Sequence, residues 1–178
     1  MTPTLPLPDG WRLRAWRNSD APSLARHADN VKVWRHMSDR FPRPYTLAVA
    51  QHWTSRGHVD FGGENWAITL DDVAVGGCGL HRGQGQFGCA VEIGYWLGEP
   101  YWGRGVASQV VRVLTESAFT LPGVVRVFAG VHADNPASIR VLEKNRFVHE
   151  GVLRKSALKA GVPVDRVIYA KIGSVTED

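Results

Sequence analysis

Two strand-like segments in the middle of the chain, "NWAITL" (residues 65–70) and "VAVGGCGL" (residues 73–80), are separated by only two residues, Asp71 and Asp72. So short a link predicts a tight β-hairpin, which makes the two strands antiparallel neighbours. A third strand-like segment, "CAVEIGYWL" (residues 89–97), follows after a glycine-rich stretch. The centre of the chain is therefore expected to be a sheet built largely from antiparallel strands.

Helical patterns flank this centre on both sides. Before it we expect a strand over residues 10–16, a helix over 18–37 that breaks near Asp29–Asn30, and a short helix over 46–57 that is capped by Thr46 and stopped by Gly57. After it we expect a helix from Val106 to about Leu121, a strand over 124–131, a helix over 135–145 and a closing hairpin of strands 147–158 and 162–172. This order predicts one mixed α/β domain over residues 1–178.

Composition fits a soluble globular protein, with 44% hydrophobic and 21% charged residues. The sequence shows neither a bilayer-length apolar run nor the pattern of a signal peptide, so we expect no membrane association. Two cysteines, Cys78 and Cys89, have no metal-like spacing and suit a reducing compartment, which predicts a cytoplasmic protein. The net charge of +4 is spread along the chain, which fits either a mildly basic surface or a small anionic ligand, and no direct nucleic-acid binding is expected.

Several familiar motifs are excluded. "GQGQFG" (residues 83–88) matches the dinucleotide fingerprint, but a strand follows it where that fingerprint needs a helix, so a hairpin loop is the better interpretation. The P-loop and the hydrolase nucleophile elbow are missing. The seven histidines show no metalloprotease spacing, and no metal site is expected.

The loop "WGRGVA" (residues 102–107) stands directly before a predicted helix. A helix N-terminus offers unpaired amides and a partial positive charge. Gly103 and Gly105 remove side chains that would keep an anion away, and Arg104 adds charge. This arrangement predicts a backbone site that suits a pyrophosphate. The alternative is that the two glycines only make a tight strand-to-helix turn and bind nothing.

Taken together, "VEIGYWLGEPYWGRGVASQVV" and "NPASIRVLEKNRFVHEGVLR" resemble the GNAT acyl-CoA N-acyltransferases, and among them the ribosomal-protein acetyltransferases of the RimJ/RimL type. The resemblance runs from about Leu13 to Tyr169. It implies a twisted, mixed but mostly antiparallel sheet of about seven strands flanked by helices. Two neighbouring strands are expected to diverge near Glu92–Leu97, where acetyl-CoA would lie.

The resemblance also implies which residues hold acetyl-CoA. The family loop Q/R-x-x-G-x-G/A falls on Trp102, Gly103, Arg104, Gly105, Val106 and Ala107. Backbone contacts to the pantetheine arm are expected at Tyr95, Trp96 and Leu97, and a further contact at Asn135. Trp102 departs from the family's usual Gln or Arg. Arg146 replaces a Gly at a helix end, so either its backbone is strained or the helix ends differently.

Glu92 is the candidate base, acting through water, because strand alternation separates it from the aliphatic face of Val91, Ile93 and Leu97. An ordinary exposed glutamate is the alternative, and His132 is the reserve candidate. The resemblance also implies that Ser138, three residues after Asn135, protonates the leaving thiolate. The position at which many relatives carry a Tyr is Leu142 here, which is a further departure from the family pattern. Asn135 and Ser138 would also make a good helix start without any ligand.

These residues predict transfer of an acetyl group from acetyl-CoA to a primary amine, with a protein N-terminal α-amine as the first choice of acceptor. A small-molecule amine such as an amino acid, polyamine or aminoglycoside is the second choice. A non-catalytic acyl-CoA-binding module is the third. A homodimer is compatible with the resemblance.

Overall fold

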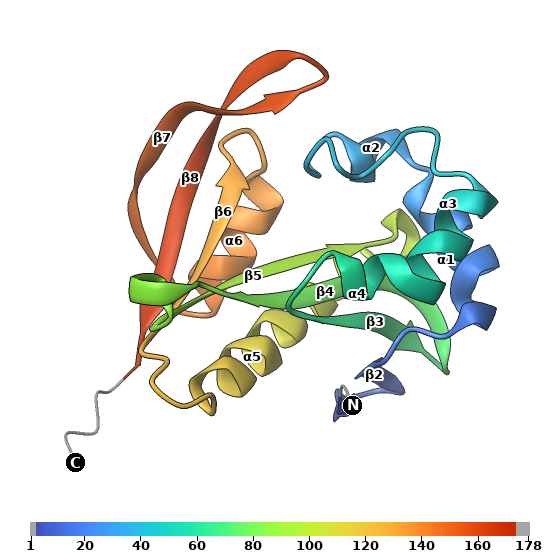
Figure 1. Cartoon of the computed structure of the whole chain (residues 1–178), viewed down its shortest axis with the longest axis horizontal. Coiled ribbons are helices and arrows are strands. Elements are labelled where there is room, and N and C mark those ends of the chain that lie inside the picture. The colour runs from blue at the N-terminus through green and yellow to red at the C-terminus, as the bar shows by residue number, and fades with distance from the viewer. Residues whose placement is uncertain (1–2, 174–178) are drawn as a thin grey trace.

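The computed structural model describes residues 3–173, whose strands form one sheet (Figure 1). The spatial order is β1-β2-β3-β4-β5-β6-β8-β7. Every neighbouring pair is antiparallel except β5 and β6, which are parallel. The strands are β1 (Leu5–Pro6), β2 (Trp11–Arg14), β3 (Glu64–Leu70), β4 (Val73–Arg82), β5 (Ala90–Leu97), β6 (Arg126–His132), β7 (Val148–Lys159) and β8 (Val162–Ile172).

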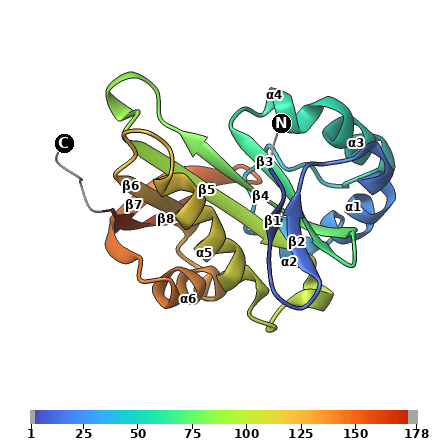
Figure 2. The same ribbon diagram turned by 90° about the horizontal axis from the view of Figure 1, so that it is seen from below.

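Helices cover both faces of this sheet (Figures 1 and 2). On one face lie the two long helices α5 (Val106–Phe119) and α6 (Pro136–Lys144). The other face carries α1 (Ala21–Ala28), α3 (Leu47–His52), the π-helical turn η2 (Trp53–Gly57) and α4 (His58–Asp60), whereas α2 (Val31–Trp34) lies near the tip of the β7–β8 hairpin. Short 3-10 turns are η1 (Asn18–Asp20), η3 (Gly85–Phe87) and η4 (Glu99–Tyr101). No helix within residues 3–173 is long and apolar enough to cross a bilayer.

The two faces of the sheet have separate apolar cores. The larger core joins the sheet to α5 and α6 and contains the fully buried side chains of Val91, Val110 and Leu114. The smaller core joins the sheet to α1 and α3 and is rich in alanine and aromatic residues, among them Trp16 and Tyr45. Side chains of β5 alternate between the two, so Val91, Ile93 and Leu97 face the larger core and Trp96 contacts the smaller one.

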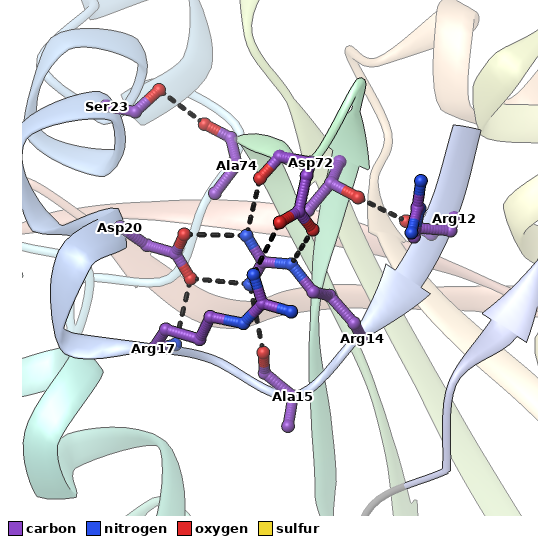
Figure 3. Close-up of polar contacts among 9 residues, drawn as sticks. Arg12, Arg14, Ala15, Arg17, Asp20, Ser23, Asp72 and Ala74 are labelled. Carbon is purple, nitrogen blue, oxygen red and sulfur yellow. Dashed lines mark hydrogen bonds and ion pairs between the residues drawn. The ribbon is translucent and has the colours of Figure 1, made fainter. Parts of the chain in front are cut away.

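A buried arginine fixes the start of α1 against the sheet (Figure 3). The guanidinium of Arg14, at the end of β2, donates to both carboxylate oxygens of Asp20 at 2.8 Å each. It also donates to the carboxylate of Asp72 at 2.8 Å and to the Asp72 carbonyl at 2.7 Å. Because Arg14 and Asp20 are both buried, this bidentate pair replaces the water that the two charges lose on folding. The cluster holds β2, α1 and the β3–β4 turn together.

The predicted fold class is confirmed, and one strand was missed. The short strand β1 lies in the proline-rich start of the chain, which the sequence analysis left without structure. The break in the first helical segment occurs at Asp29–Asn30 as expected, and the Asn30 side chain accepts from the Lys32 N–H to start α2. The Asp71–Asp72 turn is also confirmed, with both residues at positive φ.

The predicted stop of the third helical segment at Gly57 is wrong. Gly57 keeps helical backbone angles, and the chain continues through α4 to Asp60. A side chain at Gly57 would lie 3.3 Å from ring atoms of both His52 and Trp53, so this glycine serves close packing rather than termination. Gly62, at φ +83°, follows the last helical turn and ends it.

Arg146 occupies the left-handed position after α6, at φ +62°. Its N–H donates to the Glu143 carbonyl, and the Phe147 N–H donates to the Leu142 carbonyl at 3.1 Å. These two bonds define a Schellman ending, in which Leu142 and Phe147 also share the apolar core. Arg146 thus adopts the strained left-handed backbone conformation, and α6 ends with the same hydrogen-bond pattern that a glycine at this position would allow.

Candidate active site

The strands β5 and β6 separate soon after they begin. Their parallel pairing covers only Ala90, Val91 and Glu92, opposite Arg126, Val127 and Phe128. Beyond Glu92, β5 stays paired with β4 as far as Leu97, while β6 stays paired with β8 as far as His132. The predicted divergence near Glu92–Leu97 is thus confirmed, and a cleft of about 1610 Å³ extends along it.

The free edge of β5 presents backbone groups to this cleft. The Gly98 N–H donates to the Val75 carbonyl, which fixes the alternation between β5 and β4. Ile93, Tyr95 and Leu97 therefore turn their N–H and C=O groups away from β4, toward the side where β6 has left. Trp96 turns its backbone toward β4, so its contribution to the cleft is its indole ring.

The loop before α5 offers a series of unpaired amides. No described backbone or side-chain group accepts a hydrogen bond from the amides of residues 103–107. Gly103 and Gly105 have φ +75° and +78°, and a Cβ at either position would meet nothing within 4 Å. The side chain of Val106 is buried in the larger core, which leaves only its amide to contribute. The loop is an open cradle at a helix N-terminus, which suits an anion.

Trp102 ties this loop to the end of β5. Its indole N–H donates to the Leu97 carbonyl at 2.7 Å. This bond occupies one of the free edge groups of β5 and explains how a tryptophan can replace the family's usual Gln or Arg. The replacement supports the loop's position, while the amides remain free.

Positive charge gathers in the same part of the cleft. Arg104 in the loop and Arg140 and Lys144 on α6 all line it, and none of the three pairs with a carboxylate among the described residues. Arg140 and Lys144 are four residues apart on one side of their helix. The sequence analysis missed both, because a basic residue on a helix surface has no distinguishing local pattern.

Ser138 lies in the first turn of α6 and meets Tyr95 across the cleft. The Tyr95 hydroxyl is 2.7 Å from Ser138 Oγ. Asn135 accepts from the Ser138 N–H at 3.2 Å, so its predicted role as a helix cap is confirmed. Burial raises the pKa of Tyr95 to about 12, which keeps the phenol protonated at neutral pH.

The tyrosine position that many relatives use is Leu142, and this side chain is fully buried in the larger core. Tyr95 brings a phenol to Ser138 from β5 instead. The sequence analysis gave Tyr95 a backbone role only, because side-chain contacts between β5 and α6 depend on how the helix packs.

Glu92 faces the opposite side of the sheet from Ser138, with its side chain 41% exposed. Arg166 on β8 donates to the Glu92 carboxylate at 3.2 Å, and His81 is its cross-strand neighbour on β4. His132 is buried at the end of β6, and its ring centroid lies 6.3 Å from that of His36. Burial lowers the pKa of His132 despite nearby Asp134, so its ring is neutral at pH 7. Arg166, His81 and His36 were not predicted, since they approach from distant segments.

The predicted cofactor and catalytic residues therefore line one cleft. The loop amides and the Tyr95–Ser138 pair lie toward the α5 and α6 face, and Glu92 lies toward the face with α1 to α4. Within residues 3–173, no three His, Cys, Asp or Glu side chains are grouped so as to hold a metal ion. The arrangement suits a long anionic ligand that passes between two strands and presents a reactive end to the second face.

A family model described as the acetyltransferase (GNAT) domain matches residues 11–148. The chain belongs to the GNAT acetyltransferase family. It is thus an N-acetyltransferase of the GNAT type, as the sequence resemblance indicated.

Relatives cover nearly the whole chain. An uncharacterized N-acetyltransferase of Bacillus subtilis, YoaA, is 36% identical over 89% of this chain and 90% of its own length. The ribosomal-protein-serine acetyltransferase of Escherichia coli is 27% identical over 97% of this chain and 98% of its own length. A solved structure of RimL, a ribosomal L7/L12 alpha-N-protein acetyltransferase in complex with coenzyme A, has a TM-score of 0.82 at 23% identity. It covers 96% of this chain and 98% of that one, and this likeness establishes the fold.

Proposed function

We propose that this enzyme transfers the acetyl group of acetyl-CoA to the α-amine at the N-terminus of a protein. The observation that carries the proposal is the single cleft that joins free loop amides, a free strand edge and a carboxylate on the far face. The similarity to the ribosomal-protein-serine acetyltransferase over nearly its whole length supports a protein acceptor.

The residues present fit acetyl-CoA. Gly103 and Gly105 leave open space over the unpaired amides, which suits a pyrophosphate, and Arg104, Arg140 and Lys144 supply charge for its phosphates. The N–H and C=O groups of Ile93 and Tyr95 can pair with the amides of a pantetheine arm as an added strand would. Asn135 lines the same cleft and caps α6.

Acetyl-CoA supplies the acetyl group in activated form, as a thioester with a thiolate leaving group. The chain's own task is to polarise the carbonyl and to handle two protons. The backbone N–H groups at the free edge of β5 are donors already fixed in place, which is the arrangement that stabilises a developing oxyanion.

The Tyr95–Ser138 pair holds a proton at the thiol side of the cleft. The Tyr95 phenol keeps its proton at pH 7. In the proposed step it donates to Ser138 Oγ while Ser138 donates its own hydrogen toward the sulfur. At 2.7 Å, the Tyr95 hydroxyl can pass its proton to Ser138 Oγ as Ser138 gives its own proton to the sulfur. Ser138 is therefore the proposed acid, with Tyr95 as the residue that supplies it.

Glu92 is the proposed base at the acceptor side. Arg166 donates to its carboxylate at 3.2 Å and so positions it to accept a proton through water from the incoming ammonium. The neutral imidazole of His132 is the reserve acceptor of that proton.

The test is release of free CoA thiol from acetyl-CoA in the presence of candidate amines. N-terminally free peptides are compared with the same peptides carrying a blocked N-terminus, and with a polyamine and an aminoglycoside. We expect turnover with the free peptides alone. Turnover with the small amines alone would show that the acceptor is a small molecule and not a protein N-terminus. No turnover with any amine would refute the proposal.

A further inference from the structure

On the sheet face that carries α1, α3 and α4, the side chains of β4 and β5 form a stripe whose chemistry changes along its length. Three cross-strand pairs lie on this face: His81 with Glu92, Gly79 with Gly94, and Gly77 with Trp96. The stripe is therefore polar at one end, bare of side chains in the middle and aromatic at the other end. Successive pairs are two residues apart, about 7 Å along a strand.

The bare middle is open space. A Cβ built on Gly94 would meet no atom within 4 Å, and its φ is not in the left-handed region, so the backbone itself does not require glycine there. Gly79 is different, because a Cβ there would lie 2.7 Å from the Asn65 side-chain oxygen. The lack of a side chain at Gly94 leaves room above the strands and has no backbone or packing cause in the described structure.

Aromatic rings lie on the walls of the cleft into which this space opens. Trp96 packs edge-on against Phe41 at 5.6 Å, and Trp53 packs against both Trp16 at 6.3 Å and Phe61 at 5.7 Å. All of these rings line the cleft. They come from β5, the end of β2 and the segments around α3 and α4, so these walls are assembled from distant parts of the sequence.

Trp16 adds a polar atom to the aromatic end. Its side chain is buried, and its indole N–H has no hydrogen-bond partner in the described part of the chain. A Cβ on Gly77 would lie 3.1 Å from the Trp16 ring and 2.9 Å from Trp96 Nε1, so the two indoles meet above this glycine.

On the basis of the proposed function, we infer that the acceptor carries an aromatic side chain next to its amine, as an N-terminal phenylalanine or tyrosine does. With the amine at Glu92, the acceptor's first side chain lies over Gly94, and its ring faces Trp96 and Phe41. The Trp16 indole nitrogen is enclosed by protein atoms, so it is expected to give no preference between tyrosine and phenylalanine.

Peptides that differ only in their first residue test this inference. We expect kcat/KM for tyrosine and phenylalanine peptides to exceed that for alanine and serine peptides by about ten- to a hundredfold. The same order is expected in calorimetric affinities for the CoA-loaded protein. Equal values for phenylalanine and alanine peptides overturn the inference.

The substitution Gly94→Val fills the space above the strands. We expect it to lower kcat/KM for the phenylalanine peptide at least tenfold while the alanine peptide changes less than about threefold. Gly151→Val is the matched control. Gly151 also lies in a strand with nothing within 4 Å of its Cβ position and no left-handed φ, but outside the cleft, so no peptide should be affected.

Two results separate this inference from the proposed function. An equal loss for all peptides in Gly94→Val would place Gly94 at the reacting atoms and overturn the aromatic pocket, while the transferase function stands. If no amine is acetylated at all, the proposed function fails. The calorimetric comparison of phenylalanine and alanine peptides then still decides whether the pocket selects aromatic side chains.

Discussion

Gly105→Val tests where the pyrophosphate of acetyl-CoA binds. Gly105 caps the start of α5 at φ +78°, with open space where its Cβ would be. A valine there places a branched side chain over the unpaired amides of residues 103–107. The difficulty is that a β-branched residue at positive φ also strains the backbone, by about 1–2 kcal/mol.

Gly161→Val controls for that strain. Gly161 lies in the β7–β8 turn, also at φ +78° and with no atom within 4 Å. Both variants therefore carry a similar backbone cost, and the difference between them reports the position of the side chain. If the valine at residue 105 removes one charge-assisted hydrogen bond to the pyrophosphate, the loss is about 1.5–3 kcal/mol. This corresponds to roughly a tenfold to hundredfold weaker Kd.

The assay is titration calorimetry of acetyl-CoA into both variants and the original protein, with a thermal melt of each. We expect similar Tm values for the two variants and weaker acetyl-CoA binding in Gly105→Val alone. Equal affinity in the two variants would show that the pyrophosphate does not lie on these amides, and the cofactor position proposed above would be wrong.

Three other perturbations address the proton-handling groups and the fold. Glu92→Gln is expected to lower turnover by about a hundred- to ten-thousandfold at neutral pH, with unchanged acetyl-CoA affinity. The loss of turnover should become smaller at higher pH, because more of the acceptor amine is then already neutral. Equal turnover of the two forms at neutral pH would assign the role of base to His132 or to bulk water. Because the pKa of Tyr95 is raised from 10.0 to about 12, the neutral phenol stabilises the fold fully below pH 10, and this stability is lost as pH rises through 12. Tyr95→Phe should therefore reduce the alkaline fall of Tm, and an unchanged fall would contradict the shift. Asp20→Asn removes the buried bidentate partner of Arg14, which keeps its pair with Asp72, and should cost about 1.5–3 kcal/mol, or roughly 3–12 °C in Tm. Arg17→Ala at an exposed pair should cost less than about 1 kcal/mol.

The sequence predicted those parts of the structure that depend on local pattern. The Asp71–Asp72 hairpin, the break at Asp29–Asn30 and the Asn135 cap all follow from backbone preferences of the residues themselves. The predicted helix stop at Gly57 was wrong because the sequence alone does not distinguish a glycine needed for close packing from one that ends a helix. Only the contact with His52 and Trp53 distinguishes the two uses.

In the candidate site, too, features within one segment were predicted and contacts between distant segments were not. The loop at residues 102–107 was predicted from one continuous segment. The divergence after Glu92 was predicted from the family resemblance, because it involves β5 and β6, which lie far apart in the sequence. The contact between Tyr95 and Ser138 and the ion pair between Glu92 and Arg166 were not predicted. Each joins residues more than forty positions apart, and such pairs depend on the packing of whole elements.

The short pairing between β5 and β6 has a mechanical consequence. The sheet is continuous in hydrogen bonds, but its two parts, β1 to β5 and β6 to β8, are joined by only three residue pairs at one end. A ligand that pairs with the free edge of β5 and contacts α6 acts as a removable cross-link between these parts. At a hundred times its Kd, such a ligand stabilises the folded state by about 2.7 kcal/mol. Acetyl-CoA bound as proposed would therefore also join the two parts of the sheet for as long as it stays bound.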